Sequence, residues 1–150
     1  MNKNNRLLII SLLLVASAFL LLSQNKNQSY LKINDSTIKV KVAKTVQEQT
    51  IGLGGELNLA ENQGMLFVFP DQQVRNFWMK DMLFPIDIIW IQDNYIIAIE
   101  KNVPIPTGDQ QNIPQYRSPQ PVNYVLEVNA GFTDKTNIAI GNEVDFFLLD

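Results

Sequence analysis

The sequence predicts a mainly β or α+β fold: a small antiparallel, barrel-like sheet of six or seven strands with one or two short helices, behind an N-terminal transmembrane segment. Short apolar runs of strand length recur between residues 37 and 149, and turn residues or prolines separate them. Only two short stretches carry the signals of a helix. Residues 35–150 are enough for one hydrophobic core and too few for two domains.

The first elements of the domain are predicted from alternation and capping. Residues 37–42 (TIKVKV) alternate apolar side chains with lysines, which is typical of a half-buried strand. Thr45 and Glu48 have the spacing of a capping box, so a short helix should begin there, and Gly52, Gly54 and Gly55 should end it. The run at residues 65–69 (MLFVF) is continuously apolar and is followed by a proline, which predicts a central strand ending at that point.

The middle of the domain combines a hairpin with a long loop. Residues 76–82 and 86–91 are further strand candidates, and the turn residues 92–94 (QDN) should connect the second of them to a strand at residues 95–100. Residues 101–121 contain five prolines and show no periodicity. A loop of this length in a small domain is either a functional flap or a disordered insert.

The last part of the chain returns to the strand pattern. Residues 122–128 predict a strand, and residues 131–137 predict a helical turn. Residues 138–141 then lead into a final strand at residues 144–149. These two strands complete the predicted sheet.

The N-terminus carries a membrane-targeting signal. Leu7–Leu22 is uninterruptedly rich in apolar residues and follows Lys3 and Arg6, which places the N-terminus in the cytoplasm and the domain on the extracytoplasmic side. Cleavage at Ala16-Ser17-Ala18 would leave an apolar new N-terminus, so an uncleaved anchor is favoured over a cleaved signal peptide, which would give a secreted or periplasmic protein. The predicted organisation is a signal anchor or signal peptide at residues 1–23, a polar tether at 24–34 and one globular domain at 35–150.

Composition excludes several classes of chemistry. The chain has no cysteine and no histidine, so it lacks thiolate nucleophiles, disulfides and the commonest transition-metal ligand. All 15 acidic residues lie in the predicted domain, and four of the 12 basic residues precede it. A domain with this negative balance and no basic stripe is not expected to bind nucleic acid. We also expect no cofactor and no metal site.

Two carboxylates in apolar strands are the first candidate site residues. Asp87 has apolar neighbours on both sides and is either a usable acid, base or ligand, or a structural carboxylate that accepts backbone hydrogen bonds or pairs with Lys80 or Arg75. Glu127 poses the same question on a second strand, or it faces solvent. If Asp87 and Glu127 faced one cavity, they could serve a hydrolase or lyase together with Lys80 or Tyr116.

A second group of candidates suggests ligand binding. Trp78, with Phe77, Tyr116 and Tyr124, would form an aromatic platform for a sugar ring or a peptide side chain, unless these rings only fill the core. Basic residues nearby would add charge for an anionic group. The candidate ligand-binding residues are Trp78, Lys80, Asp87, Tyr116, Arg117, Ser118 and Glu127.

Five ordered blocks of sequence resemble a known family. The blocks are GMLFVF at residues 64–69, FWMK at 77–80, PIDI at 85–88, YRS at 116–118 and YVLEVNAG at 124–131. Over residues 40–146 the chain resembles the domain of unknown function 192 family. The resemblance implies a small β-rich barrel with a helix or two, often behind an export signal, and no established chemistry.

The chain also departs from the family pattern. Members typically continue after Gly52-Leu53 with a methionine and a nearby arginine, where this chain has Gly54-Gly55-Glu56. Members often carry a cysteine where this chain has Asn112. A role that rests on that arginine or on loop thiols is therefore not expected here.

The sequence thus favours a membrane-anchored extracytoplasmic binding or accessory module. Residues 77–87 would form one wall of a cleft for a small molecule, glycan or peptide, and the proline-rich loop would cover it. A carboxylate-based hydrolase or lyase and a structural protein-interaction domain of an envelope complex are the alternatives.

Overall fold

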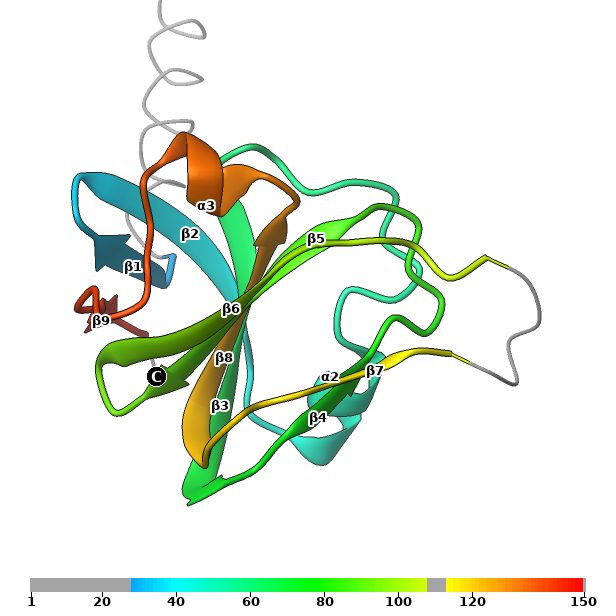
Figure 1. Ribbon diagram of the computed structural model, residues 1–150, viewed down its shortest axis with the longest axis horizontal. Coiled ribbons are helices and arrows are strands. Elements are labelled where there is room, and N and C mark those ends of the chain that lie inside the picture. The colour runs from blue at the N-terminus through cyan, green and yellow to red at the C-terminus, as the bar shows by residue number, and fades with distance from the viewer. Residues whose placement is uncertain (1–27, 108–112, 150) are drawn as a thin grey trace, which may run out of the picture. The chain divides into compact units, whose positions relative to one another are not determined.

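The computed structural model describes residues 28–107 and 113–149, and its strands and helices lie within residues 29–148, which form one compact unit. Seven strands form a sheet that is curled into a half-barrel, and a two-stranded ribbon and two short helices complete the described part (Figure 1). The mainly β prediction is therefore confirmed. The predicted membrane segment falls on residues 1–27, outside the described residues. In the ranges that are described, no helix is long and apolar enough to cross a membrane.

The large sheet has the strand order β6-β5-β8-β3-β2-β1-β9, and β4 pairs with β7 in the ribbon. Only β2 and β3 pair in parallel within this sheet, because α2 and the loop after it carry the chain back across. The elements are β1 (Tyr30–Ile33), β2 (Ser36–Ala43), α2 (Val46–Ile51), β3 (Gln63–Gln73), β4 (Asn76–Trp78), β5 (Ile86–Gln92), β6 (Tyr95–Val103), β7 (Gln115–Arg117), β8 (Val122–Asn129), α3 (Phe132–Lys135) and β9 (Asp145–Phe147).

Several local predictions are confirmed. The capping box starts α2: the Glu48 backbone N–H donates to Thr45 Oγ1 over 3.2 Å, and the Thr45 N–H donates to a Glu48 carboxylate oxygen over 2.9 Å. Gly52 ends the helix with φ 55°, a left-handed conformation that glycine adopts without strain. The hairpin of β5 and β6 turns at Asp93, and β3 is the central strand of the sheet.

The N-terminal boundary of the domain was placed too late. Residues 30–33, predicted as tether, form β1, which pairs with both β2 and β9. Leu31 and Ile33 are fully buried, so this strand is part of the core. Polar residues surround these two apolar positions, and a four-residue strand is too short to show a clear alternating pattern among them.

Three strand boundaries also differ from the prediction. β3 continues through Pro70 to Gln73, because its register with β8 is interrupted between Val68 and Gln73 and the proline therefore breaks no regular ladder. The strand expected at 76–82 ends at Trp78, because the chain turns at Asp81, where φ is 57°. The last strand is shorter than predicted, since β9 ends at residue 147.

The proline-rich segment is not one continuous loop. β6 extends to Val103, and residues 115–117 form β7, which pairs with β4 through partners such as Phe77 and Tyr116. Residues 108–112, also part of the predicted loop, lie outside the described residues. The predicted flap is therefore, in part, the second strand of a ribbon.

The large sheet buries side chains on both faces. One face, here called the α3 face, packs Leu31, Ile33, Ile38, Val40, Leu66, Ile89, Ile91, Ile96, Leu126, Val128, Phe132, Ile138 and Val144. The other, here called the ribbon face, packs Ala43, Leu53, Met65, Phe67, Met79, Met82, Ile86, Ile88, Trp90, Val103, Val122 and Val125 beneath α2 and the β4–β7 ribbon. Burial on both faces explains the apolar runs at residues 65–69 of β3 and 88–91 of β5.

Candidate functional site

The candidate site centres on Glu127, in the middle of β8. Its strand neighbours Leu126 and Val128 point to the α3 face, so Glu127 points to the ribbon face. Its cross-strand partners are Met65 in β3 and Ile88 in β5, both buried. The alternative that Glu127 faces solvent is wrong, because the ribbon and α2 cover this face as well.

Within the described residues, Glu127 is a buried acid without a partner. The residue is 5% exposed, and its Oε2 atom makes no hydrogen bond. Burial raises the pKa of the Glu127 carboxyl from 4.5 to about 8, because an apolar environment disfavours the charged form. A buried polar atom without a partner is costly, and such exceptions are concentrated at functional sites.

A small cavity of about 20 Å³ lies beside the Glu127 carboxyl. This volume is enough for one group of the size of a water molecule. Glu127 and Lys80 are its two charged residues. Its lining is completed by Gln49, Thr50, Ile51, Gly52, Leu53, Phe67, Phe77, Trp78 and Met82.

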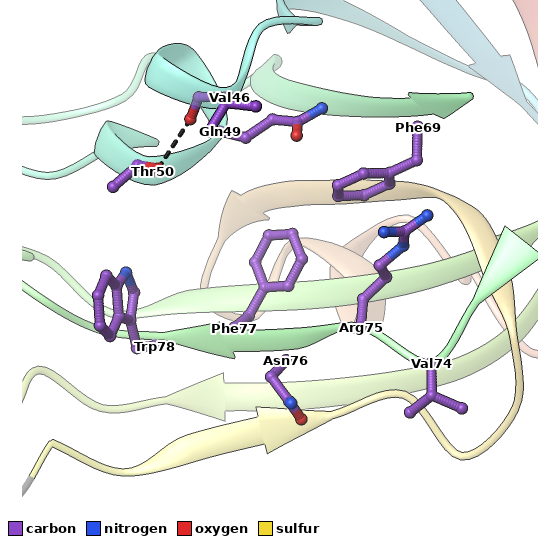
Figure 2. A pocket seen from close by; sticks show the side chains of 9 residues that line it. All are labelled: Val46, Gln49, Thr50, Phe69, Val74, Arg75, Asn76, Phe77 and Trp78. Carbon is purple, nitrogen blue, oxygen red and sulfur yellow. Dashed lines mark hydrogen bonds between the residues drawn. The ribbon is translucent and has the colours of Figure 1, made fainter. Parts of the chain in front are cut away.

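The cavity adjoins a larger groove of about 370 Å³ between α2 and β4. Figure 2 shows α2 on one side of this groove and the β4 segment on the other, with the Phe69 and Phe77 rings between them. The cavity and the groove share Gln49, Thr50, Phe77 and Trp78. The remaining residues of the groove are Val46, Phe69, Val74, Arg75 and Asn76.

The loop after α2 that carries Gly52, Gly54 and Gly55, here called the glycine loop, positions the cavity. A Cβ atom on Gly54 would lie 2.9 Å from the Ile51 carbonyl oxygen and 3.1 Å from the Lys80 carbonyl oxygen, so only glycine allows this close approach. The Gly55 N–H donates to the Asp81 carbonyl over 2.9 Å. The loop is thereby held against the turn that follows β4, and α2 and Lys80 meet at the same cavity.

Trp78 and Lys80 form the outer rim. Trp78 is 46% exposed, and the Lys80 ammonium lies 5.7 Å from the centre of its ring, within the range of a cation–π contact. No carboxylate in the described part of the chain lies within salt-bridge distance of Lys80. Beneath the rim, the Phe77 ring is fixed by edge-to-face contacts with Phe67 and Trp90, at centroid distances of 4.8 and 5.5 Å.

Arg75 forms the far end of the groove. Its guanidinium pairs with Asp71 and stacks over Phe69, with Cζ 4.0 Å from the ring centre. The buried Nε atom of Arg75 has no hydrogen-bond partner among the residues that the structure describes. Arg75 therefore makes this end of the groove polar without supplying an unpaired charge.

Asp87 lies on the opposite face of the sheet from Glu127. In the register of β5 and β8, Asp87 pairs with Val128 and Ile88 pairs with Glu127, so the two carboxylates point to different faces. The paired-carboxylate arrangement that the sequence suggested is therefore not formed. A reaction that needs both groups at one substrate has no geometric basis in this fold.

Asp87 has the arrangement of a structural carboxylate. It is fully buried and accepts hydrogen bonds from the backbone N–H groups of Asn102, Gly131 and Thr133 and from the Thr133 hydroxyl, at 2.7–3.1 Å. These bonds connect β5 to β6 and to the start of α3. Neither Lys80 nor Arg75, the partners considered from the sequence, is involved.

The other predicted site residues are dispersed. Tyr116 packs on the ribbon face as the strand partner of Phe77, whereas the Tyr124 ring contacts Phe146 on the α3 face. Ser118 is buried, accepts from the Arg75 N–H and donates to the Gln120 carbonyl, and Arg117 is exposed on β7. Of the predicted set, only Trp78, Lys80 and Glu127 line one cavity.

Sequence reasoning missed the contribution of α2. Gln49 and Thr50 line both the cavity and the groove, although the capping box and the glycine cluster indicated only a short helix. The Gln49 side-chain amide donates to the Val68 carbonyl over 2.8 Å, which ties the helix to β3. The unusual density of glycines after the helix was the signal of a close approach.

Two solved structures are similar in fold to this chain. A protein from Sinorhizobium meliloti 1021, described as a proposed transcription regulator, is similar with a TM-score of 0.69 and 27% identity, over 79% of this chain and 92% of that one. A protein of unknown function from Novosphingobium aromaticivorans DSM 12444 is similar with a TM-score of 0.69 and 24% identity, over 79% of this chain and 83% of that one. No curated protein matches the sequence. The DUF192 family, described as Uncharacterized ACR, matches residues 29–146, and the chain therefore belongs to this family.

Proposed function

We propose that this protein is a membrane-anchored extracytoplasmic binding module that holds a small ligand or a peptide side chain in the groove between α2 and β4. The observation that carries the proposal is the unpartnered Glu127 carboxyl beside a cavity at that groove. An acid held in an apolar core without a partner destabilises the fold, so its presence is better explained by a ligand that satisfies it.

The groove surface supports the same function. Val46, Ile51 and Trp78 are 81%, 57% and 46% exposed, and each lines the groove or the cavity. Exposed apolar side chains beside buried polar groups are typical of binding sites. The ligand should therefore combine an apolar part, which contacts Trp78, with a polar group that reaches Glu127.

The extracytoplasmic location is proposed from the N-terminal sequence. Lys3 and Arg6 precede the apolar run at residues 7–22, which is the order that exports the following domain. We expect the full-length protein to remain with membranes after an alkaline carbonate wash. Recovery of a shortened form in the soluble fraction would instead indicate a cleaved signal peptide.

Two other functions have less support. A two-carboxylate hydrolase would need Asp87 and Glu127 at one substrate, and they lie on opposite faces of the sheet. The Sinorhizobium protein is described as a proposed transcription regulator, but residues 35–150 of this chain carry more acidic than basic residues and no basic stripe. That charge pattern does not favour contact with nucleic-acid phosphates.

Thermal unfolding of the full-length protein tests the binding function. A panel of amines, carboxylic acids, glycans and short peptides should include a compound that raises the midpoint, since a ligand at about 100 times its Kd stabilises a fold by about 2.7 kcal/mol. Trp78→Ala should remove this shift. Tyr95→Ala, which changes a comparably exposed aromatic on the β5–β6 hairpin, should preserve it.

A protein-interaction domain would give a different result. No compound would then shift the midpoint in a Trp78-dependent manner, and the apolar rim would serve a protein partner. That outcome would reject the small-ligand function.

A further inference from the structure

We propose that the group bound beside Glu127 is a primary ammonium, held by the Glu127 carboxylate and by the surrounding aromatic rings. This inference rests on the proposed binding function and specifies its ligand class.

The unsatisfied atom requires a donor. Glu127 Oε2 is buried and has no hydrogen-bond partner in the described part of the chain. The Gln49 side-chain amide, a donor in the same lining, already donates to the Val68 carbonyl. A ligand that brings N–H groups would therefore complete the site, and an ammonium has three such donors.

The size of the cavity selects a small cation. About 20 Å³ accommodates a single water-sized group, and an ammonium head has this size. A guanidinium or a trimethylammonium group has several heavy atoms around its charge and does not fit without rearrangement. The alkyl chain that carries the ammonium would extend from the cavity into the adjoining groove of about 370 Å³.

The rings favour positive charge. Phe67, Phe77 and Trp78 line the cavity together with Glu127. Aromatic faces attract a cation, and the attraction is stronger where water is excluded. Trp78 already makes such a contact, with the Lys80 ammonium 5.7 Å from its ring centre.

The charge state of Glu127 makes binding depend on pH. In the free protein its pKa of about 8 keeps the carboxyl mainly protonated at neutral pH, and an ammonium binds the ionised form. Binding near pH 7 should therefore release close to one proton. The affinity should rise about tenfold per pH unit up to about pH 8 and then level off.

Among the described residues that line this cavity, Lys80 is the one charged residue besides Glu127. The lining residues from α2, β3 and β4 and from the glycine loop are uncharged. The positive charge of Lys80 at the rim should weaken ammonium binding, and it would strengthen the binding of an anion. Replacing Lys80 by methionine therefore distinguishes the two ligand classes by the sign of the change.

The test uses full-length protein and three unbranched four-carbon probes: n-butylammonium, butyrate and n-butanol. Isothermal titration calorimetry in buffers of different ionisation enthalpy gives both the affinity and the number of protons released. We expect n-butylammonium to bind most tightly. Glu127→Gln, which resembles the protonated acid, should weaken n-butylammonium binding about 10- to 100-fold, because a charged hydrogen bond is lost. Lys80→Met should tighten n-butylammonium binding about two- to fivefold, because a nearby positive charge is removed.

The source of the ammonium is resolved by one further probe. The peptide acetyl-Gly-Lys-Gly-amide presents the same group on a peptide backbone that can lie in the groove. Tighter binding of the peptide than of n-butylammonium would identify a lysine side chain as the natural group. Equal or weaker binding would indicate a small free amine.

Two results would overturn the ammonium assignment. Butyrate binding that survives Glu127→Gln and weakens in Lys80→Met would identify an anion site. Ammonium binding without proton release and unaffected by Glu127→Gln would place the amine elsewhere. In either case a Trp78-dependent ligand would leave the binding function intact, whereas the absence of any such ligand would reject that function.

Discussion

At the residue scale, two buried carboxylates in adjacent strands differ completely in their surroundings. Asp87 accepts four hydrogen bonds, three of them from backbone N–H groups, whereas Glu127 Oε2 accepts none. The first arrangement stabilises a fold and the second costs stability. Sequence patterns presented both as acids in apolar strands, and only the structure separates the structural acid from the candidate ligand-binding one.

Asp87→Asn should destabilise the domain without touching the groove. The substitution places an N–H₂ group among N–H donors and removes the charge that strengthens their bonds, so we expect a loss of about 3 kcal/mol in the free energy of unfolding. Urea denaturation measures this loss. Asp145→Asn, at an exposed position on β9, should change stability by less than about 0.5 kcal/mol.

The ligand response separates structure from function at Asp87. Folded Asp87→Asn protein should keep the Trp78-dependent midpoint shift, because Asp87 lies on the α3 face and the groove on the ribbon face. If ligand binding were lost while stability was unchanged, Asp87 would belong to the site after all.

At the element scale, the sequence predicted what local physics decides. Alternation identified β2, the continuous apolar run at residues 65–69 identified β3, and the capping box identified α2. The sequence did not predict β1 or β7, because strands of four and three residues contain too few alternating positions to form a pattern. Their pairing depends on β2, β9 and β4, which are contacts made only in the folded molecule.

The candidate site could also be predicted in part. Trp78, Lys80 and Glu127 were all identified as candidates, because polar and aromatic residues in apolar strands are unusual. Which of them share a cavity depends on sheet register and on the cover over each face, neither of which a periodicity of two specifies. The contribution of α2 depends further on the close approach of Gly54 to the Lys80 backbone.

At the scale of the whole molecule, both faces of the sheet are covered, and this places Glu127 in the core. A one-sided sheet would expose every second residue of β8, and Glu127 would then be an ordinary surface acid. Because α2, the glycine loop and the β4–β7 ribbon cover the second face, the same alternation produces a buried carboxyl. The stability of the molecule is thereby linked to the protonation of one side chain.

This linkage predicts that Glu127 reduces stability as the pH rises. The folded protein holds its proton up to about pH 8, whereas the unfolded chain releases it near 4.5. The stabilisation is therefore fully present below about pH 4.5 and is lost by about 1.4 kcal/mol per pH unit up to about pH 8. Glu127→Gln lacks this proton, so its advantage in unfolding free energy over the natural protein should grow across that range and then remain constant.

Urea denaturation of both proteins at pH 5, 6, 7, 8 and 9 measures that difference. The pKa values of Glu48, Glu61 and Asp71 are lowered by their hydrogen bonds and ion pairs, so their contribution is lost on the acid side, as the pH falls through their folded-state values. These contributions are common to both proteins and cancel in the comparison. A difference that stays flat from pH 5 to 8 would mean that Glu127 is already ionised in the folded protein. The proton release expected on ammonium binding would then have no source.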